Sequence, residues 1–313
     1  MQTIEVTPYE DVQKVLDDHK DMLQSAEVTQ IVFTRGHYYQ RLHIVGQHLE
    51  VKSMGPTLID YALGADALGH NQTFNTATLL VEGEHISFNN LTFQNSAGLG
   101  SKVGQAVAVY ANGDHIDFNN CSFLGFQDTV CFGPIIHMNR DNTVPDTPVT
   151  HRELKDARYQ LNDCYIEGNI DYIFGGGSVW IKNSTIQSLL SKTTPEEGYV
   201  CAPCTDQDRK FGFIFDHCRI MTAAGVNNHF LGRPWRPYAK AYYVDCQLGA
   251  GINPQGWHLW GDDEHSADVA DFREYDCQPG GDRPSWAKVY GEADNKLMQE
   301  IDEYFNGKRP HQL

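Results

Sequence analysis

Short stretches in which apolar and polar residues alternate recur along the chain, and this period of two predicts β-strands rather than helices. Residues 81–93 and 111–123 match each other closely at an interval of 30 residues. The second half of this unit is an apolar residue, a spacer, a small polar residue, then Cys, Leu or Ser, another spacer and a second apolar residue. Its six copies are FNNLTF (88–93), FNNCSF (118–123), LNDCYI (161–166), IKNSTI (181–186), FDHCRI (215–220) and YVDCQL (243–248).

The spacing of the copies indicates how these strands are arranged. Intervals of 20 to 43 residues suit a coil of a few short strands whose loops vary in length, with each coil stacked on the next. Such a stack is a parallel β-helix, so we predict an all-β fold. The alternative is a β-sandwich or two-domain β protein with a chance local repeat, but Greek-key sandwiches do not require self-similarity.

Both ends of a β-helix need covering, because a terminal coil exposes unpaired strand edges. At the N-terminus we predict a capping helix with Thr7 as N-cap, Pro8 in the first turn and Glu10 completing a capping box. A second helix near 292–305, with an apolar face, is expected to pack near the other end. The predicted division of this single domain is an N-terminal cap at 1–25, β-helix coils at 26–262 and a C-terminal extension at 263–313.

Charge and hydropathy exclude two classes of partner. The chain has 24 Lys and Arg against 41 Asp and Glu, a net charge of −17, and no basic run that would neutralise a line of phosphates. We therefore expect no nucleic acid partner. Apolar runs are far shorter than the roughly 20 residues that span a bilayer, so no membrane association is expected. Without a signal-peptide pattern, a cytosolic location is predicted if Met1 is the native start; a recut secreted form is the alternative.

Eight cysteines raise the question of disulfides. Four of them, Cys121, Cys164, Cys218 and Cys246, occupy the same place in the repeat, so we interpret them as buried thiols rather than a disulfide framework. A single CxxC pair, Cys201 and Cys204, is a weak metal signal without a second pair. We interpret it as structural and predict no metal.

The repeat register brings two carboxylates together. Asp128 lies seven residues after Cys121, and Asp171 lies seven residues after Cys164. Residues 133–157 are polar and proline-containing, and we interpret them as a loop inserted in a single coil. The two aspartates would then lie on neighbouring coils about 4.8 Å apart, close enough for one pKa to rise while the other stays low. A solvated acidic patch is the alternative.

Several motifs in this chain resemble those of pectin methylesterases. They are GQAVAVYANGDHIDFNNCSFLGFQDTV, GNIDYIFGG, FLGRPW and INPQGWHLW, with Gly36–Tyr38 near the start of the match and Phe272–Tyr275 near its end. The resemblance implies a right-handed parallel β-helix that hydrolyses methyl esters of galacturonate units in pectin or methylated oligogalacturonides, releasing methanol, with no metal or cofactor. The chain departs from the family at Cys131, usually aromatic, and at Gln40, usually acidic, which bears on fine specificity.

Carried over residue by residue, the resemblance implies that Asp171 is the nucleophile and Asp128 the acid that later acts as base. Arg233 would orient the nucleophile, and a guanidinium within about 4–6 Å can lower a carboxyl pKa by about 1–3 units. Gln105 and Gln127 would hold the oxyanion. The implied substrate-binding aromatics are Trp235, Phe174, Tyr172 and Trp257, whose rings suit the apolar faces of sugars.

The net charge refines the expected substrate. Because de-esterified pectin is polyanionic, a protein at −17 would repel it, so highly methylated or short oligosaccharides are the easier substrates. The 133–157 insertion, which is expected to reshape one wall of the cleft, also favours short oligomers. The alternatives are a pectate-lyase-like enzyme, a retaining glycosidase with carboxyls about 5–5.5 Å apart, and a non-catalytic carbohydrate-binding relative.

Overall fold

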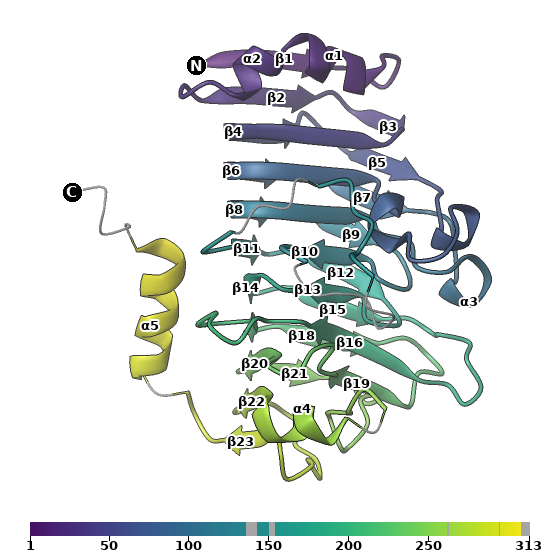
Figure 1. The fold of residues 1–313 in the computed structure, drawn as a ribbon, viewed down its shortest axis with the longest axis vertical. Coiled ribbons are helices and arrows are strands. Elements are labelled where there is room, and N and C mark those ends of the chain that lie inside the picture. Colours follow the sequence, from purple (N-terminus) through teal and green to yellow (C-terminus); the bar gives the residue numbers. More distant parts are fainter. Residues whose placement is uncertain (136–142, 150–153, 262, 294, 308–313) are drawn as a thin grey trace.

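A computed structural model describes residues 1–135, 143–149, 154–261, 263–293 and 295–307. The chain winds repeatedly around one axis, so that strands from successive coils lie one above the other (Figure 1). The named strands pair in parallel and form two sheets, which we call sheet A and sheet B. This arrangement is a parallel β-helix, as the repeat predicts.

Sheet A contains 15 strands among the described residues. Its main path, in spatial order, is β1 (Gln2–Val6), β2 (Thr29–Phe33), β4 (Leu42–Ser53), β6 (Leu79–Asn89), β8 (Val109–Asn119), β11 (Arg158–Asn162), β14 (Ser178–Lys182), β17 (Phe213–Asp216), β20 (Lys240–Val244), β22 (Asp271–Tyr275) and β23 (Lys288–Tyr290). A side branch of the sheet consists of β10 (Val130–Phe132), β13 (Ile173–Gly175), β16 (Gly198–Pro203) and β19 (His229–Gly232). The side branch carries the candidate site described below.

Sheet B contains eight strands among the described residues, one for each of eight successive coils. They are β3 (Gly36–Tyr39), β5 (Thr57–Tyr61), β7 (Thr92–Asn95), β9 (Ser122–Leu124), β12 (Tyr165–Gly168), β15 (Thr185–Ser188), β18 (Arg219–Thr222) and β21 (Gln247–Leu248). Between the sheets, the inward-facing apolar residues form one continuous core. Within it like residues stack on like, as Phe88 does on Phe118, with ring centroids 4.9 Å apart.

Each copy of the six-residue repeat forms the corner between a strand of sheet A and a strand of sheet B. Its third residue has a positive φ of 50° to 60° in all six copies, at Asn90, Asn120, Asp163, Asn183, His217 and Asp245. The left-handed backbone region is costly for most residues with a Cβ, and Asn, Asp and His are enriched among those that adopt it. The small polar residue of the repeat is therefore required by the corner.

The repeat cysteines lie directly after these corners and point inward. All eight cysteines of the chain are buried free thiols. The Cys121 thiol donates to the carbonyl of Phe88, and the Cys164 thiol donates to that of Phe118, in each case in the preceding coil. Burial raises the pKa of Cys121 to about 12. These side chains act as small core residues, as predicted from their place in the repeat.

The N-terminal cap differs from the prediction in where its helix begins. Residues 2–6 form β1 in sheet A, and α1 (Val12–Asp18) follows with Asp11, not Thr7, as N-cap. Glu10 does accept hydrogen bonds from the Thr7 amide and hydroxyl, but in the turn before the helix. α1 and α2 (Lys20–Leu23) lie over the first coil (Figure 1) and bury Val12, Leu16 and Leu23 in the core. The helix caps the coil, but it starts later than predicted.

The C-terminal helix α5 (Asn295–Asn306) does not cap the far end, which corrects the expectation. It lies beside the stack (Figure 1), where Ile301 and Phe305 pack against Trp180 and other outward-facing residues of sheet A. At the far end lie α4 (Glu264–Val269) and β23, and Trp286 packs on Phe272 there. Sheet A thus begins before the expected first coil residue, 26, and ends after the expected last one, 262.

The remaining helical segments are short: α3 (Gly100–Val103) and the 3-10 turns η1 (Ala65–Ala67) and η2 (Thr73–Thr76). No helix in the described ranges is both long and apolar enough to cross a membrane.

Candidate active site

The side branch of sheet A sets the register of the two aspartates. β10 pairs with the start of β8, and β11 pairs with its end, so the segment 133–157 interrupts what is one long strand in the preceding coil. This matches the predicted insertion, although its residues 136–142 and 150–153 lie outside the described residues. Val130 pairs with Ile173, so Asp128 and Asp171 occupy equivalent positions on neighbouring coils. The amide of Asp128 also donates to the carbonyl of Ile170 at 3.0 Å.

Both aspartates adopt a left-handed backbone conformation two residues before their strands, β10 and β13, begin. Their φ values are 63° for Asp128 and 50° for Asp171, in a region that costs energy for a residue with a Cβ and persists where the surrounding structure enforces it. The hydrogen bond from Val130 to the carbonyl of Tyr172 holds the two corners together. The consequence is that both carboxyl groups turn away from the core and toward a common pocket.

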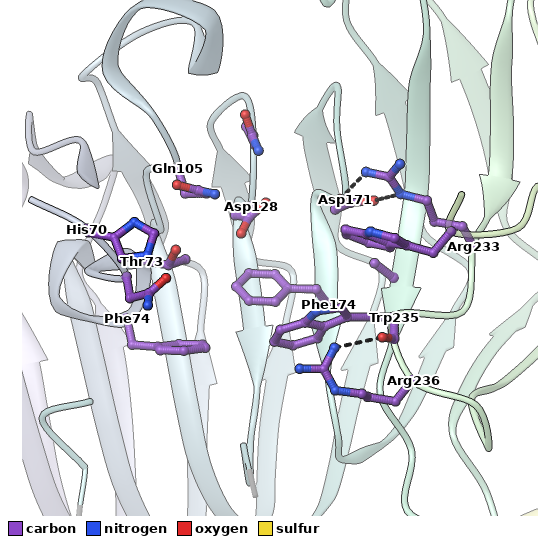
Figure 2. A pocket seen from close by; sticks show the side chains of 14 residues that line it. His70, Thr73, Phe74, Gln105, Asp128, Asp171, Phe174, Arg233, Trp235 and Arg236 are labelled. Atoms are coloured by element: carbon purple, nitrogen blue, oxygen red, sulfur yellow. Dashed lines mark hydrogen bonds and ion pairs between the residues drawn. The ribbon is translucent and has the colours of Figure 1, made fainter. Parts of the chain in front are cut away.

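A pocket of about 430 Å³ lies over β10, β13, β16 and β19. It contains both aspartates, both predicted glutamines and the predicted arginine, and Figure 2 labels Gln105, Asp128, Asp171 and Arg233 around it. The residues that line it are His70, Asn71, Thr73, Phe74, Gln105, Gln127, Asp128, Asp171, Phe174, Ala202, Arg233, Trp235, Arg236 and Trp260. Seven of the nine predicted site residues are thus brought together in one cavity.

Asp171 is held by a bidentate ion pair. Nε and Nη2 of Arg233 donate to its two carboxylate oxygens at 2.9 and 2.7 Å, and Asp171 is only 5% exposed. Arg233 follows β19 directly, and its amide donates to the carbonyl of Cys201, which fixes where the side chain starts. A two-point guanidinium pair favours the ionised carboxylate and fixes the plane of the group.

Asp128 is half-buried, and the surroundings that set the pKa of its carboxyl differ from those of Asp171. Burial raises the pKa of its carboxyl well above the ordinary range, the neighbouring Asp171 anion raises it further, and Arg233 opposes the shift. Asp128 therefore favours the protonated form while its neighbour is paired as an anion. Two adjacent carboxyl groups whose environments separate their protonation states are suited to divide acid and nucleophile roles.

Gln105 and Gln127 line the pocket beside Asp128, and Figure 2 labels Gln105 next to it. Their backbones are tied to neighbouring segments, since the carbonyl of Gln105 accepts from Ala65 and that of Gln127 accepts from Ala106. Gly100 lies directly against the side chain of Gln127, where a Cβ on residue 100 would come within 2.2 Å of Oε1. Because Gly100 has no side chain, it leaves room for the side chain of Gln127 in the pocket.

Of the four predicted substrate-binding aromatics, two reach the pocket. Phe174 and Trp235 line it and contact each other at 6.1 Å between ring centroids. Tyr172 and Trp257 do not line it, which corrects the expectation for both. Tyr172 points into the core with its hydroxyl bonded to Ser188. Trp257 is 1% exposed and donates from Nε1 to Glu274, because bridge pairing of Gly232 with Trp257 places this residue inside the last coils.

Sequence reasoning missed several lining residues. Trp260 lies three residues after Trp257 in the same motif, and its ring covers the Arg233 guanidinium at 3.8 Å. Phe74, together with His70 and Thr73, comes from a loop outside the repeat, so no periodic signal marked it. Arg236 follows Trp235 directly, so the motif FLGRPW ends one residue before it.

The insertion contributes to the wall beneath this pocket. Its described residues Ile135 and Val149 belong to the same apolar cluster as Phe74 and Phe174. Asp146 accepts a hydrogen bond from Gln72 at 2.7 Å. The described part of the insertion is therefore packed against the segment that carries Phe74.

The described side chains offer acid–base and nucleophilic groups rather than a metal-binding cluster. Across the described ranges, no three His, Cys, Asp or Glu side chains come together as a metal ion requires. The pocket combines a paired anionic carboxylate, a carboxyl whose pKa is raised, two amides and several rings. Such a set can attack a carbonyl carbon, hold the oxyanion and protonate a leaving group.

Comparison with known proteins gives the same family throughout. The chain is 32% identical over 222 residues to pectinesterase 31 of Arabidopsis thaliana, covering 69% of this chain and 60% of that protein. It is 29% identical to probable pectinesterase 8 of the same plant, covering 87% and 65%. The matches thus span less than two thirds of these relatives.

Solved structures share the fold. Pectin methylesterase from carrot superposes with a TM-score of 0.73 at 22% identity, covering 90% of this chain and 85% of that one. A pectin methylesterase from Erwinia chrysanthemi gives 0.71 at 20% identity, covering 98% and 97%. A sequence model described as Pectinesterase matches residues 5–289. With its fold, its motifs and nearly its whole length matched, this chain belongs to the pectinesterase family.

Proposed function

We propose that this protein hydrolyses the methyl esters of galacturonate units in pectin or methylated oligogalacturonides and releases methanol. The observation that carries the proposal is the pairing of two carboxyl groups in different environments: both oxygens of Asp171 accept from Arg233 at 2.7 and 2.9 Å, whereas burial and the neighbouring Asp171 raise the pKa of Asp128. Family membership supports the reaction class.

In the proposed reaction, a carboxylate oxygen of Asp171 attacks the ester carbonyl carbon and forms a tetrahedral intermediate. Gln105 and Gln127 stabilise its oxyanion through their amide groups. As the intermediate collapses, the bond to the methoxy oxygen breaks, and Asp128 transfers its proton to the departing methanol. Asp128 then accepts a proton from the water that hydrolyses the acyl-enzyme, which restores both carboxyl groups.

The aromatic lining supports a sugar as substrate. Phe174, Trp235 and Phe74 present rings to the pocket, and sugar rings offer apolar C–H faces to such surfaces. A pectin methylesterase of this fold has been solved in complex with a hexasaccharide, which supports an oligosaccharide as the substrate here. The net charge of −17 favours highly methylated or short oligomers over de-esterified polymer, because like charges repel.

The deciding experiment measures methanol release from methylated oligogalacturonides by the wild type, Asp171→Ala and Asp128→Ala. We expect the wild type to release methanol, Asp171→Ala to release none above background, and Asp128→Ala to be slowed by about 10² to 10⁴-fold. Retained activity in Asp171→Ala would overturn the assignment of the nucleophile.

The same assay separates the alternative activities. A lyase would produce unsaturated ends and lose activity with a chelator, whereas a glycosidase would produce reducing ends without methanol. A binding protein would retain oligosaccharide without turnover. Equal rates on long pectin and on short methylated oligomers would contradict the substrate preference. The predicted cytosolic location is a separate matter, which fractionation of the native cells with an antibody would test.

A further inference from the structure

The guanidinium of Arg233 is enclosed on both faces by aromatic rings. Its central carbon lies 3.7 Å from the centroid of the Tyr199 ring and 3.8 Å from that of Trp260. Its edge is occupied by the two hydrogen bonds to Asp171. A planar cation with both faces stacked and one edge bonded has little freedom to rotate.

The two rings differ in what else they touch. Trp260 lines the pocket and is placed to meet substrate. Tyr199 is 4% exposed and is not among the lining residues, so it reaches the pocket only through Arg233. It belongs to none of the motifs that the sequence resemblance rests on.

Tyr199 is itself held rigidly by the β-helix register. It lies in β16, where it pairs with Phe230 of β19, and their rings stack at 5.5 Å with an angle of 16°. The Tyr199 hydroxyl shares a hydrogen bond with Nδ1 of His258 at 3.2 Å, and the His258 ring stacks on Phe230 at 4.8 Å. Three successive coils therefore support the ring on which Arg233 rests.

We propose that Tyr199 is a positioning residue that fixes Arg233, and through it the carboxylate plane of Asp171, for attack on the ester. This inference rests on the proposed esterase function and extends it to a buried residue that contacts no substrate. Arg233 emerges from β19 next to the Tyr199 strand, since its amide bonds to Cys201. Without the ring, one face of the guanidinium loses its support, and the Asp171 carboxylate can rotate out of line.

The test compares two substitutions at this position. Tyr199→Leu removes the ring, and Tyr199→Phe keeps it while losing only the hydroxyl. For Tyr199→Leu we expect kcat for methanol release to fall about tenfold with KM changed less than about twofold. Tyr199→Phe should keep the wild-type kcat and KM.

A matched control separates positioning from general loss of stability. Phe211→Leu removes a buried ring from the separate apolar cluster against α5, where Phe211 packs with Tyr242 and Tyr304, and it should keep kcat. Provided that the wild type is active, three results would each overturn the inference. They are an unchanged kcat in Tyr199→Leu, a loss of kcat in Tyr199→Phe equal to that in Tyr199→Leu, and an equal loss of kcat in Phe211→Leu. A wild type that releases no methanol would refute the proposed function itself, and this inference with it.

Discussion

Gly100 gives a sharp test of the site because its substitution adds one methyl group outside the reacting residues. In Gly100→Ala the new Cβ would lie 2.2 Å from Oε1 and 2.7 Å from Cβ of Gln127. To reach the 3.4 Å of an ordinary contact, the amide of Gln127 has to retreat by about 1 Å. Misplacing a catalytic group by about 1 Å can cost about 10²-fold in rate, so we expect kcat to fall by about that factor.

The free energy of unfolding of Gly100→Ala should rise slightly or stay unchanged. Alanine is favoured over glycine in a helix by about 0.5–1 kcal/mol, and Gly100 opens α3. Methanol release and urea denaturation of the same samples therefore separate the two effects. Gly280→Ala, where no atom lies within 4 Å of the new Cβ, is the matched control, and Gln127→Ala is the reference for complete loss of the amide. If Gly100→Ala keeps full activity while Gln127→Ala loses it, the steric reasoning is refuted.

The other predictions concern charge, core and substrate contact. Because the pKa of Asp128 is raised in the folded state, its carboxyl contributes stability below the unfolded-state pKa of about 3.9, and this stability is lost as pH rises through the folded pKa. Calorimetry should therefore show Asp128→Asn with a higher Tm than wild type near pH 8 but not near pH 4; equal shifts at both would contradict this. Trp257→Ala should lower the free energy of unfolding by about 3–5 kcal/mol in urea titrations, and a raised KM with intact stability would contradict its core placement. Trp235→Ala should raise KM about tenfold in initial-rate measurements, equivalent to about 1.4 kcal/mol of binding, whereas an unchanged KM would remove it from the substrate site.

The six-residue repeat made most of the fold predictable, because its signal lies in the local sequence. A corner that needs a left-handed residue selects Asn or Asp, and an inward position after it selects a small side chain, so Asn120 and Cys121 mark one corner as clearly as Asp163 and Cys164 mark the next. Since the corners are regular, counting from them placed Asp128 and Asp171 in the same register. That count placed them on neighbouring coils only because residues 133–157 were interpreted as an insertion within a single coil.

The ends of the fold were less predictable because several local signals compete there. Thr7 and Glu10 do bond to each other, yet the alternation of Ile4 and Val6 made the preceding residues a strand. For α5, an apolar face shows that the helix packs on something but not on what. Its position beside sheet A is decided by outward-facing rings such as Trp180, which lie more than 100 residues away in the chain.

Residue types and register thus predicted the β-helix and the adjacent aspartates, and the motif resemblance predicted the set of polar groups around them. Only the tertiary structure decided which rings face the pocket. In GWHLW, the strand-like bridge at Gly232 turns Trp257 into the core, while Trp260 lies over Arg233. Tyr199 carried no sequence signal, because its contact with Arg233 depends on stacking between coils 34 residues apart in the chain. Such contacts follow from how coils superpose, which no local pattern of residues encodes.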